Sequence, residues 1–136
     1  MDRIRPGLTG EHQATVTDEI AISFLGMDSA RVLGTPYLIL LIEMTARNSI
    51  KPLLEEGFDS VGLDVSIKHL AATPLGMQVA IRTEVIEVDG RRVKFHVEAH
   101  DGKEQVCEGT HERFVVNVAR FAERVQAKIA GAASIV

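Results

Sequence analysis

The chain has 136 residues, 46% of them hydrophobic and 25% charged, which is the composition of one ordinary globular domain. Its net charge of −4, its lack of tryptophan and its single tyrosine argue against the basic, aromatic-bearing surface of a nucleic-acid-binding protein. The only cysteine, Cys107, excludes an internal disulfide and a zinc cluster built from cysteines.

The chain gives no sign of export or membrane insertion. Its first residues, MDRIRPG, are charged and lack the apolar core of a signal peptide. Its densest apolar run, 37–42, is too short to cross a bilayer. We expect a cytoplasmic protein without nucleic-acid or membrane partners.

The first third of the chain contains one strong helix signal. Before it, the weak pattern predicts a strand around 12–16, a short helix over 18–25 and a loop over 26–34. Thr35 is a favoured N-cap and Pro36 is favoured at the first helical position. We predict a helix over 36–55, kinked late by a proline and buried on all sides in its apolar first half.

From residue 59 onward the apolar residues recur with period two, which predicts strands. The first strand is expected to turn Val61, Leu63, Val65 and Ile67 to one face. The second runs over 77–88 with a shift of phase that indicates a bulge. Asp-Gly pairs at 89–90 and 101–102 predict hairpins on either side of the third strand, 93–99. The last strand is expected over 104–116, followed by a short helix capped by Asn117.

This order predicts one α+β domain over 1–136. A strand and a long helix precede four strands in an antiparallel meander, so we expect a central helix wrapped by one curved antiparallel sheet. Such a small domain leaves a sheet edge open. Pairing of edges across a two-fold axis would close it, and we therefore expect a homodimer.

Glu43 is anomalous because it lies in LLIEMTA, the most apolar stretch of the chain. Its carboxylate could be functional. The alternative is an ion pair with Arg47, one helical turn further on. An ion pair buried between apolar residues rarely adds net stability, which weakens the second interpretation without excluding it. Both the functional carboxylate and the ion pair therefore stay open.

His69 is the second anomaly, in KHLAATPLG. It continues the inward face of its strand, yet the strand ends within a few residues. Ala71 and Ala72 leave room beside the ring, and Pro74 forces an extended exit. The ring could act as a base at a cavity, or it could be a hydrogen-bonded core histidine.

Thr35 is the third candidate. Its hydroxyl could simply cap the helix, and the helix N-terminus could also stabilise an oxyanion. An inward carboxylate, a histidine at the rim of the sheet and a helix N-terminus with a hydroxyl are the parts that acyl transfer needs. The sequence has neither a Gly-x-Ser-x-Gly elbow nor a glycine-rich phosphate loop.

The stretch HLAATPLGMQVAIRTEVIEVDGRRVKFHVEAHDG, followed by EGTHERFVVNVARF, closely resembles the fluoroacetyl-CoA thioesterase-like branch of the hotdog family. The pieces H-x-AATP-x-G, V-x-GRR, AHDG and GTHER occur in the order and spacing of that branch. The likeness runs from about residue 34 to the C-terminus. It implies a hotdog fold, usually a dimer whose sites lie at the subunit interface, so that one site takes residues from two chains.

The resemblance also implies roles for individual residues. Thr35, Glu43 and His69 match the catalytic group of the family. Gly62 matches a glycine near the acyl carbonyl, and Arg113 in GTHER matches an arginine that supports the site. The fluoroacyl-specific branch has aromatic lid residues before the helix. Here SFLGMDSARVLG is small and polar at 28–31, so we do not carry fluoroacyl selectivity over.

Together these features predict an acyl-CoA thioesterase acting on a short or small acyl group, with no metal or bound cofactor. Glu43 would activate water together with His69, or would attack the thioester itself and form an anhydride. Two alternatives stay open. One is a hotdog enzyme that hydrates enoyl-CoA, and the other is a module that binds acyl-CoA without turnover.

Overall fold

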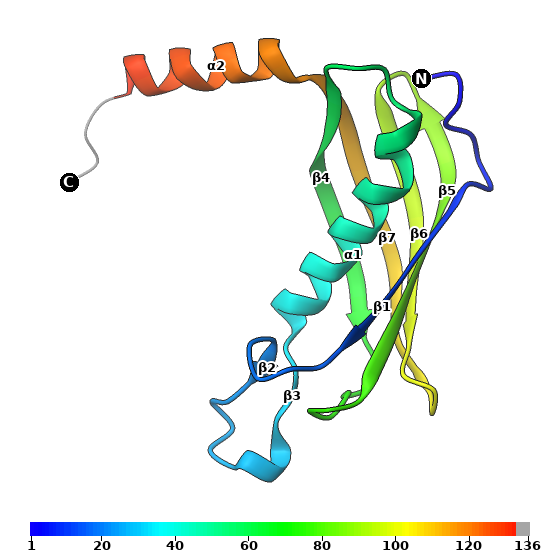
Figure 1. Cartoon of the computed structure of the whole chain (residues 1–136), viewed down its shortest axis with the longest axis vertical. Helices are drawn as coiled ribbons and strands as arrows, with labels where there is room; N and C mark the ends of the chain where they lie inside the picture. Colours follow the sequence, from blue (N-terminus) through cyan, green and yellow to red (C-terminus); the bar gives the residue numbers. More distant parts are fainter. Residues whose placement is uncertain (133–136) are drawn as a thin grey trace.

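The computed structural model describes residues 1–132 and shows one curved antiparallel sheet wrapped around a helix (Figure 1). The elements are β1 (Thr9–Thr15), β2 (Ala21–Ile22), the 3-10 turn η1 (Asp28–Ala30), β3 (Val32–Leu33), α1 (Thr35–Ile50), the 3-10 turn η2 (Lys51–Leu53), β4 (Phe58–His69), β5 (Gln78–Asp89), β6 (Arg92–His100), β7 (Gln105–Asn117) and α2 (Val118–Gly131). The main sheet has five strands in the order β1-β5-β6-β7-β4. The predicted α+β architecture is confirmed.

Helix α1 differs from the prediction at both ends. Its N-cap is Gly34, and Thr35 is already helical and makes no capping bond. The α-helix stops at Ile50 and tightens into η2, because Pro52 has no N–H to continue the ladder. The hydroxyl of Thr35 is therefore free to bond elsewhere.

One face of α1 forms the core with the sheet. Leu38, Ile42, Ala46 and Ile50 are fully buried. They pack with the inward residues of the strands, which include Val79, Ile81, Val85, Val93, Phe95, Val97, Ala99, Val106 and Val115. The opposite face of the apolar first half stays exposed, at 37% for Tyr37, 50% for Leu40 and 48% for Met44. The prediction that this half is buried on all sides was wrong for the single chain.

The strand order also corrects the expected meander. Strands β5, β6 and β7 follow one another through the two predicted hairpins, but β4 pairs with β7 and not with β5. Segment 70–77 crosses the end of the sheet instead, and there Pro74 forms a bridge with Val32. The predicted helix over 18–25 is absent, since that segment forms turns and β2.

A bulge in β4 changes which of its residues face the helix. The register with β7 shifts between Gly62 and Asp64, so Leu63 is the extra residue and is 54% exposed. Before the bulge Ser60 and Gly62 point inward, and after it His69 and its odd-numbered neighbours do. The prediction of a single inward face through Val61 and Leu63 was therefore wrong.

Candidate active site

Glu43 lies on α1 opposite the bulge of β4. Its Oε1 is 3.9 Å from Nη1 of Arg113 and 4.0 Å from Nε2 of His111, and its side chain is 36% exposed. These distances are too long for direct hydrogen bonds. The carboxylate thus faces two basic side chains and still reaches solvent.

Gly62 makes room for this carboxylate. A Cβ at position 62 would stand 2.2 Å from Oε1 of Glu43 and 3.6 Å from Cε1 of His111. Real side chains do not approach so closely, so any larger residue would displace the carboxylate. The bulge places Gly62 in this position by turning it toward the helix.

His111 is a residue of this group that the sequence analysis missed. It is fully buried on β7, and its Nδ1 is 2.8 Å from the carbonyl oxygen of Asp64. A carbonyl only accepts, so Nδ1 carries the proton and Nε2 is left to accept from Arg113 at 3.2 Å. Burial and the neighbouring Arg113 lower the pKa of His111, partly opposed by the contact with the Asp64 backbone, which keeps the ring neutral.

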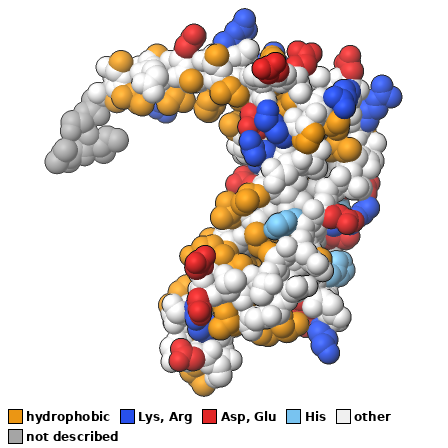
Figure 2. Space-filling view, viewed as in Figure 1, with side chains coloured by type: hydrophobic (Ala, Val, Ile, Leu, Met, Phe, Trp, Pro, Cys, Tyr) orange, Lys and Arg blue, Asp and Glu red, His pale blue; other side chains and the backbone are white. Residues whose placement is uncertain are grey.

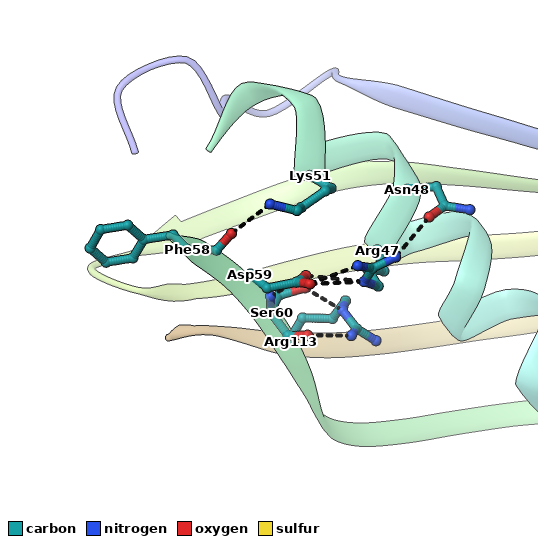
Figure 3. Close-up of polar contacts among 7 residues, drawn as sticks. All are labelled: Arg47, Asn48, Lys51, Phe58, Asp59, Ser60 and Arg113. Atoms are coloured by element: carbon teal, nitrogen blue, oxygen red, sulfur yellow. Dashed lines mark hydrogen bonds and ion pairs between the residues drawn. The ribbon is translucent and has the colours of Figure 1, made fainter. Parts of the chain in front are cut away.

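Arg113 is held in place by Ser60 of β4. Its Nε donates to the hydroxyl of Ser60 at 2.7 Å, and its Nη2 donates to the carbonyl of the same residue at 2.8 Å (Figure 3). Arg113 is 5% exposed, and burial lowers its pKa without removing its charge. Its remaining Nη1 points toward His111 and Glu43.

Arg47 pairs with Asp59, and not with Glu43 as the alternative interpretation had it. Its Nη2 is 2.7 Å and its Nε 3.0 Å from the carboxylate oxygens of Asp59 (Figure 3). Hydrogen bonding from Arg47 is the main cause that lowers the pKa of Asp59. Asp59 also accepts from the backbone N–H of Ser60 at 2.7 Å, so the pair supports the residue that orients Arg113.

Thr35 and His69 form a second group at the N-terminus of α1. The hydroxyl of Thr35 is 2.8 Å from Nδ1 of His69. Nε2 of His69 is buried and has no hydrogen-bond partner within the described residues. A buried polar atom without a partner is unusual in a folded protein and calls for an explanation, of which a catalytic role is one.

The loop after β4 brings these two residues together. The carbonyl of Thr73 accepts from the N–H of Leu33 at 2.9 Å, and Pro74 bridges to Val32. The end of β4 is thereby fixed to β3, the segment that leads directly into Thr35. The extended backbone that we predicted from Pro74 at the end of this strand is present.

His69 borders a shallow hollow. The hollow has a volume of about 310 Å³ and is lined by Ile22, Val32, Leu33, Thr35, His69, Leu70, Ala71 and Ala72. The two alanines leave space beside the ring, as predicted. Burial lowers the pKa of His69, and a backbone contact with Ala71 acts in the opposite direction. The ring is therefore neutral at neutral pH.

The two groups do not meet within one chain. Thr35 and Glu43 are separated by about 12 Å of helix at about 1.5 Å per residue. On β4, Gly62 and His69 are separated by about 20 Å of strand. No hydrogen bond or ion pair within residues 1–132 joins Glu43 to Thr35 or His69.

Two further classes of site are not formed within the described part of the chain. Residues 1–132 hold no group of three histidine, cysteine, aspartate or glutamate side chains arranged to bind a metal ion. None of the described helices is both long enough and apolar enough to span a membrane.

Comparisons with known proteins agree with this architecture. Residues 16–119 match the model of a family described as fluoroacetyl-CoA-specific thioesterase. A fluoroacetyl-CoA thioesterase from Streptantibioticus cattleyicolor is 37% identical over 97 residues, 71% of this chain and 70% of that protein. The solved structure of the fluoroacetyl-CoA thioesterase FlK aligns with a TM-score of 0.83 and 32% identity, over 92% of this chain and 97% of that chain.

A more distant structure, a thioesterase superfamily member from Thermus thermophilus, aligns with a TM-score of 0.84 and 26% identity, over 97% of this chain and all of that one (100%). The fold and its neighbours define a hotdog-fold thioesterase. Within that class, the chain belongs to the family of fluoroacetyl-CoA-specific thioesterases.

Proposed function

We propose that this enzyme hydrolyses the thioester of a short acyl-CoA, releasing the free acid and coenzyme A, in the cytoplasm. The observation that carries the proposal is the half-exposed carboxylate of Glu43, held beside Arg113 over a glycine that makes room for it. A solved FlK variant with threonine changed to serine, 31% identical to this chain, is a complex with acetyl-CoA. The buried single cysteine is compatible with a reducing compartment.

We propose further that two copies of the chain form a dimer and share each site. Strand β4 is a free edge of the sheet, and Tyr37, Leu40 and Met44 present an apolar stripe on the adjacent helix. A two-fold axis beside β4 would pair the edges, cover the stripe and bring Glu43 of one copy to the partner's Thr35 and the partner's His69.

Each residue then has a role in thioester cleavage. In one route Glu43 and the neutral ring of His69 together activate a water molecule: the water gives up a proton as its oxygen attacks the carbonyl, the C–S bond breaks, and that proton passes to the departing thiolate. In the other, Glu43 attacks the carbonyl, the thiolate leaves, and water activated by His69 cleaves the anhydride. Thr35 orients the imidazole, and Arg113 with His111 positions the carboxylate.

The oxyanion needs donors in either route. Backbone N–H groups near Gly62 or at the N-terminus of α1 are the candidates, since both lie beside the reacting groups. No step requires a metal ion or a resident cofactor. Coenzyme A enters as part of the substrate.

A thiol-release assay on acetyl-, fluoroacetyl-, propionyl- and hexanoyl-CoA tests the proposal. We expect turnover that is fastest for the short chains. A trans-enoyl-CoA run in parallel separates the alternatives, because hydration consumes the double bond without releasing thiol. Binding of acyl-CoA without release of thiol or loss of the double bond would leave only a binding module and would contradict the proposal.

A further inference from the structure

Helix α2 is amphipathic, but its apolar side has no surface to pack on among residues 1–132. All of its 14 residues are exposed. Its apolar side chains Val118, Phe121, Val125 and Ile129 recur at helical spacing and form one stripe, exposed by 37–62%. A lone helix of this length is marginal in water, so the stripe needs a partner surface.

The direction of α2 points to where that partner lies. The helix leaves the top of the sheet beside β4 and runs outward past that edge, so the molecule has the form of a hook (Figure 1). Hydrophobic atoms gather on the lower side of α2, facing the hollow of the hook (Figure 2). A helix built to lie on a membrane would be expected to turn this face away from the body of the protein.

The hollow of the hook is the space that the second copy fills in the proposed dimer. Edge pairing that sets Gly62 opposite the partner's His69 carries Phe58, four residues before Gly62, past the end of the partner's β4 to where its loop 70–76 begins, since antiparallel strands advance in opposite directions. Phe58 pairs with Asn117, the N-cap of α2, within its own chain. Helix α2 therefore starts level with the partner's loop 70–76.

That loop has apolar side chains to offer. Leu70, which directly follows His69, is 52% exposed, and Leu75 is 40% exposed. The geometry points to α2 as an arm that docks its apolar stripe on loop 70–76 of a second copy of this chain. This inference rests on the proposed dimer and adds a contact that holds the loop directly after the partner's His69.

Disulfide trapping tests the contact in the full-length protein. We expect the double variant Phe121→Cys, Leu70→Cys to form a covalent dimer on oxidation, seen at twice the chain mass on a non-reducing gel. The matched control is Glu123→Cys, Leu70→Cys, whose helix position lies on the opposite side of α2 and should not cross-link. The native Cys107 is buried and does not compete.

A second pair of variants gives a readout without cross-linking. Phe121→Asp places a charge in the stripe, and Ala127→Asp places the same charge on the opposite face. We expect Phe121→Asp to raise the dimer dissociation constant about tenfold or more, as burying a charge in an apolar contact does, and Ala127→Asp to leave it unchanged.

The outcomes distinguish a failure of the proposed α2 contact from a failure of the proposed dimer. A wild-type dimer by light scattering with no trapped Phe121–Leu70 disulfide overturns the arm and leaves the dimer standing. A wild-type monomer overturns both. Co-sedimentation of the wild type, but not of Phe121→Asp, with phosphatidylglycerol–phosphatidylcholine vesicles, without trapping, would overturn the arm in favour of a membrane surface.

Discussion

At the scale of single residues, Gly62 and Glu43 depend on each other. The carboxylate fits only because position 62 has no side chain. Glu43 is half-exposed and can swing outward, so a larger residue should displace it and leave the fold intact. A change at Gly62 therefore tests placement of the carboxylate separately from stability.

We expect Gly62→Ala to lower kcat for thioester hydrolysis by about tenfold to a hundredfold, the scale on which misplaced catalytic groups lose activity. The melting temperature should change little. Thiol release and a thermal melt measure the two effects, with Ser66→Ala, on the exposed face of the same strand, as the control. Full activity in Gly62→Ala would contradict the contact with Glu43.

The pH dependence of activity should report His69. A base must be neutral, so activity rises as pH increases through the pKa of this ring. Burial lowers that pKa, which places the midpoint of the acid limb below about 6.5. A kcat/KM profile measures it. His69→Ala should remove the limb with most of the turnover, whereas His96→Ala, outward on β6, should change neither.

The sequence could predict residues that stand out by type. Glu43 was visible because a carboxylate interrupts an apolar run, and His69 because the alternation of its strand points it inward. His111 was missed, although it precedes inward Arg113 by two residues on the same strand. Its role depends on the Asp64 carbonyl across the bulge, and such a contact has no signature in the sequence.

At the scale of elements, the Arg47–Asp59 pair joins α1 to β4. Arg47 lowers the pKa of Asp59, so the pair contributes stability above the unfolded pKa of about 3.9, which is lost as pH falls through the lower folded value. Both side chains are partly exposed, at 43% and 24%, which limits the contribution.

We expect Asp59→Asn to lower the free energy of unfolding by about 1 kcal/mol or less at pH 7, and by less at an acid pH below the folded pKa of the wild-type carboxylate. Urea unfolding at the two pH values measures the difference. Asp28→Asn, an exposed change away from the pair, is the control. An equal loss at both pH values would show that the ion pair is not the cause.

Local signals predicted the elements better than their connections. The Asp-Gly turns set β6 between its neighbours, because a tight turn leaves only one pairing. The link from β4 to β5 has no such turn, and the chain crosses the sheet there, so the expected pairing of these strands was wrong. The bulge at Leu63 left no signal either, and it decides that Gly62 faces the helix.

At the scale of the whole molecule, the exposed stripe on α1 should be an interface between two copies. We expect Leu40→Asp to shift the protein toward monomer and to lower activity in proportion, because a charge replaces an apolar side chain that the dimer would bury. Light scattering and thiol release measure the two effects. Gln13→Asp, an exposed change on β1 at the other edge of the sheet, is the control. A fully active Leu40→Asp monomer would rule out sharing of the site.

Glu43 of one chain should work with the partner's His69, and complementation between two inactive variants tests this most directly. Glu43→Gln and His69→Ala should each lose about two orders of magnitude or more in turnover as pure proteins. Unfolded together and refolded, they should form mixed dimers in which one site keeps both wild-type residues. Activity should then return to about a quarter of the wild-type rate, the statistical share of intact sites in a two-fold dimer. No recovery, with mixed dimers shown to be present, would contradict the shared site.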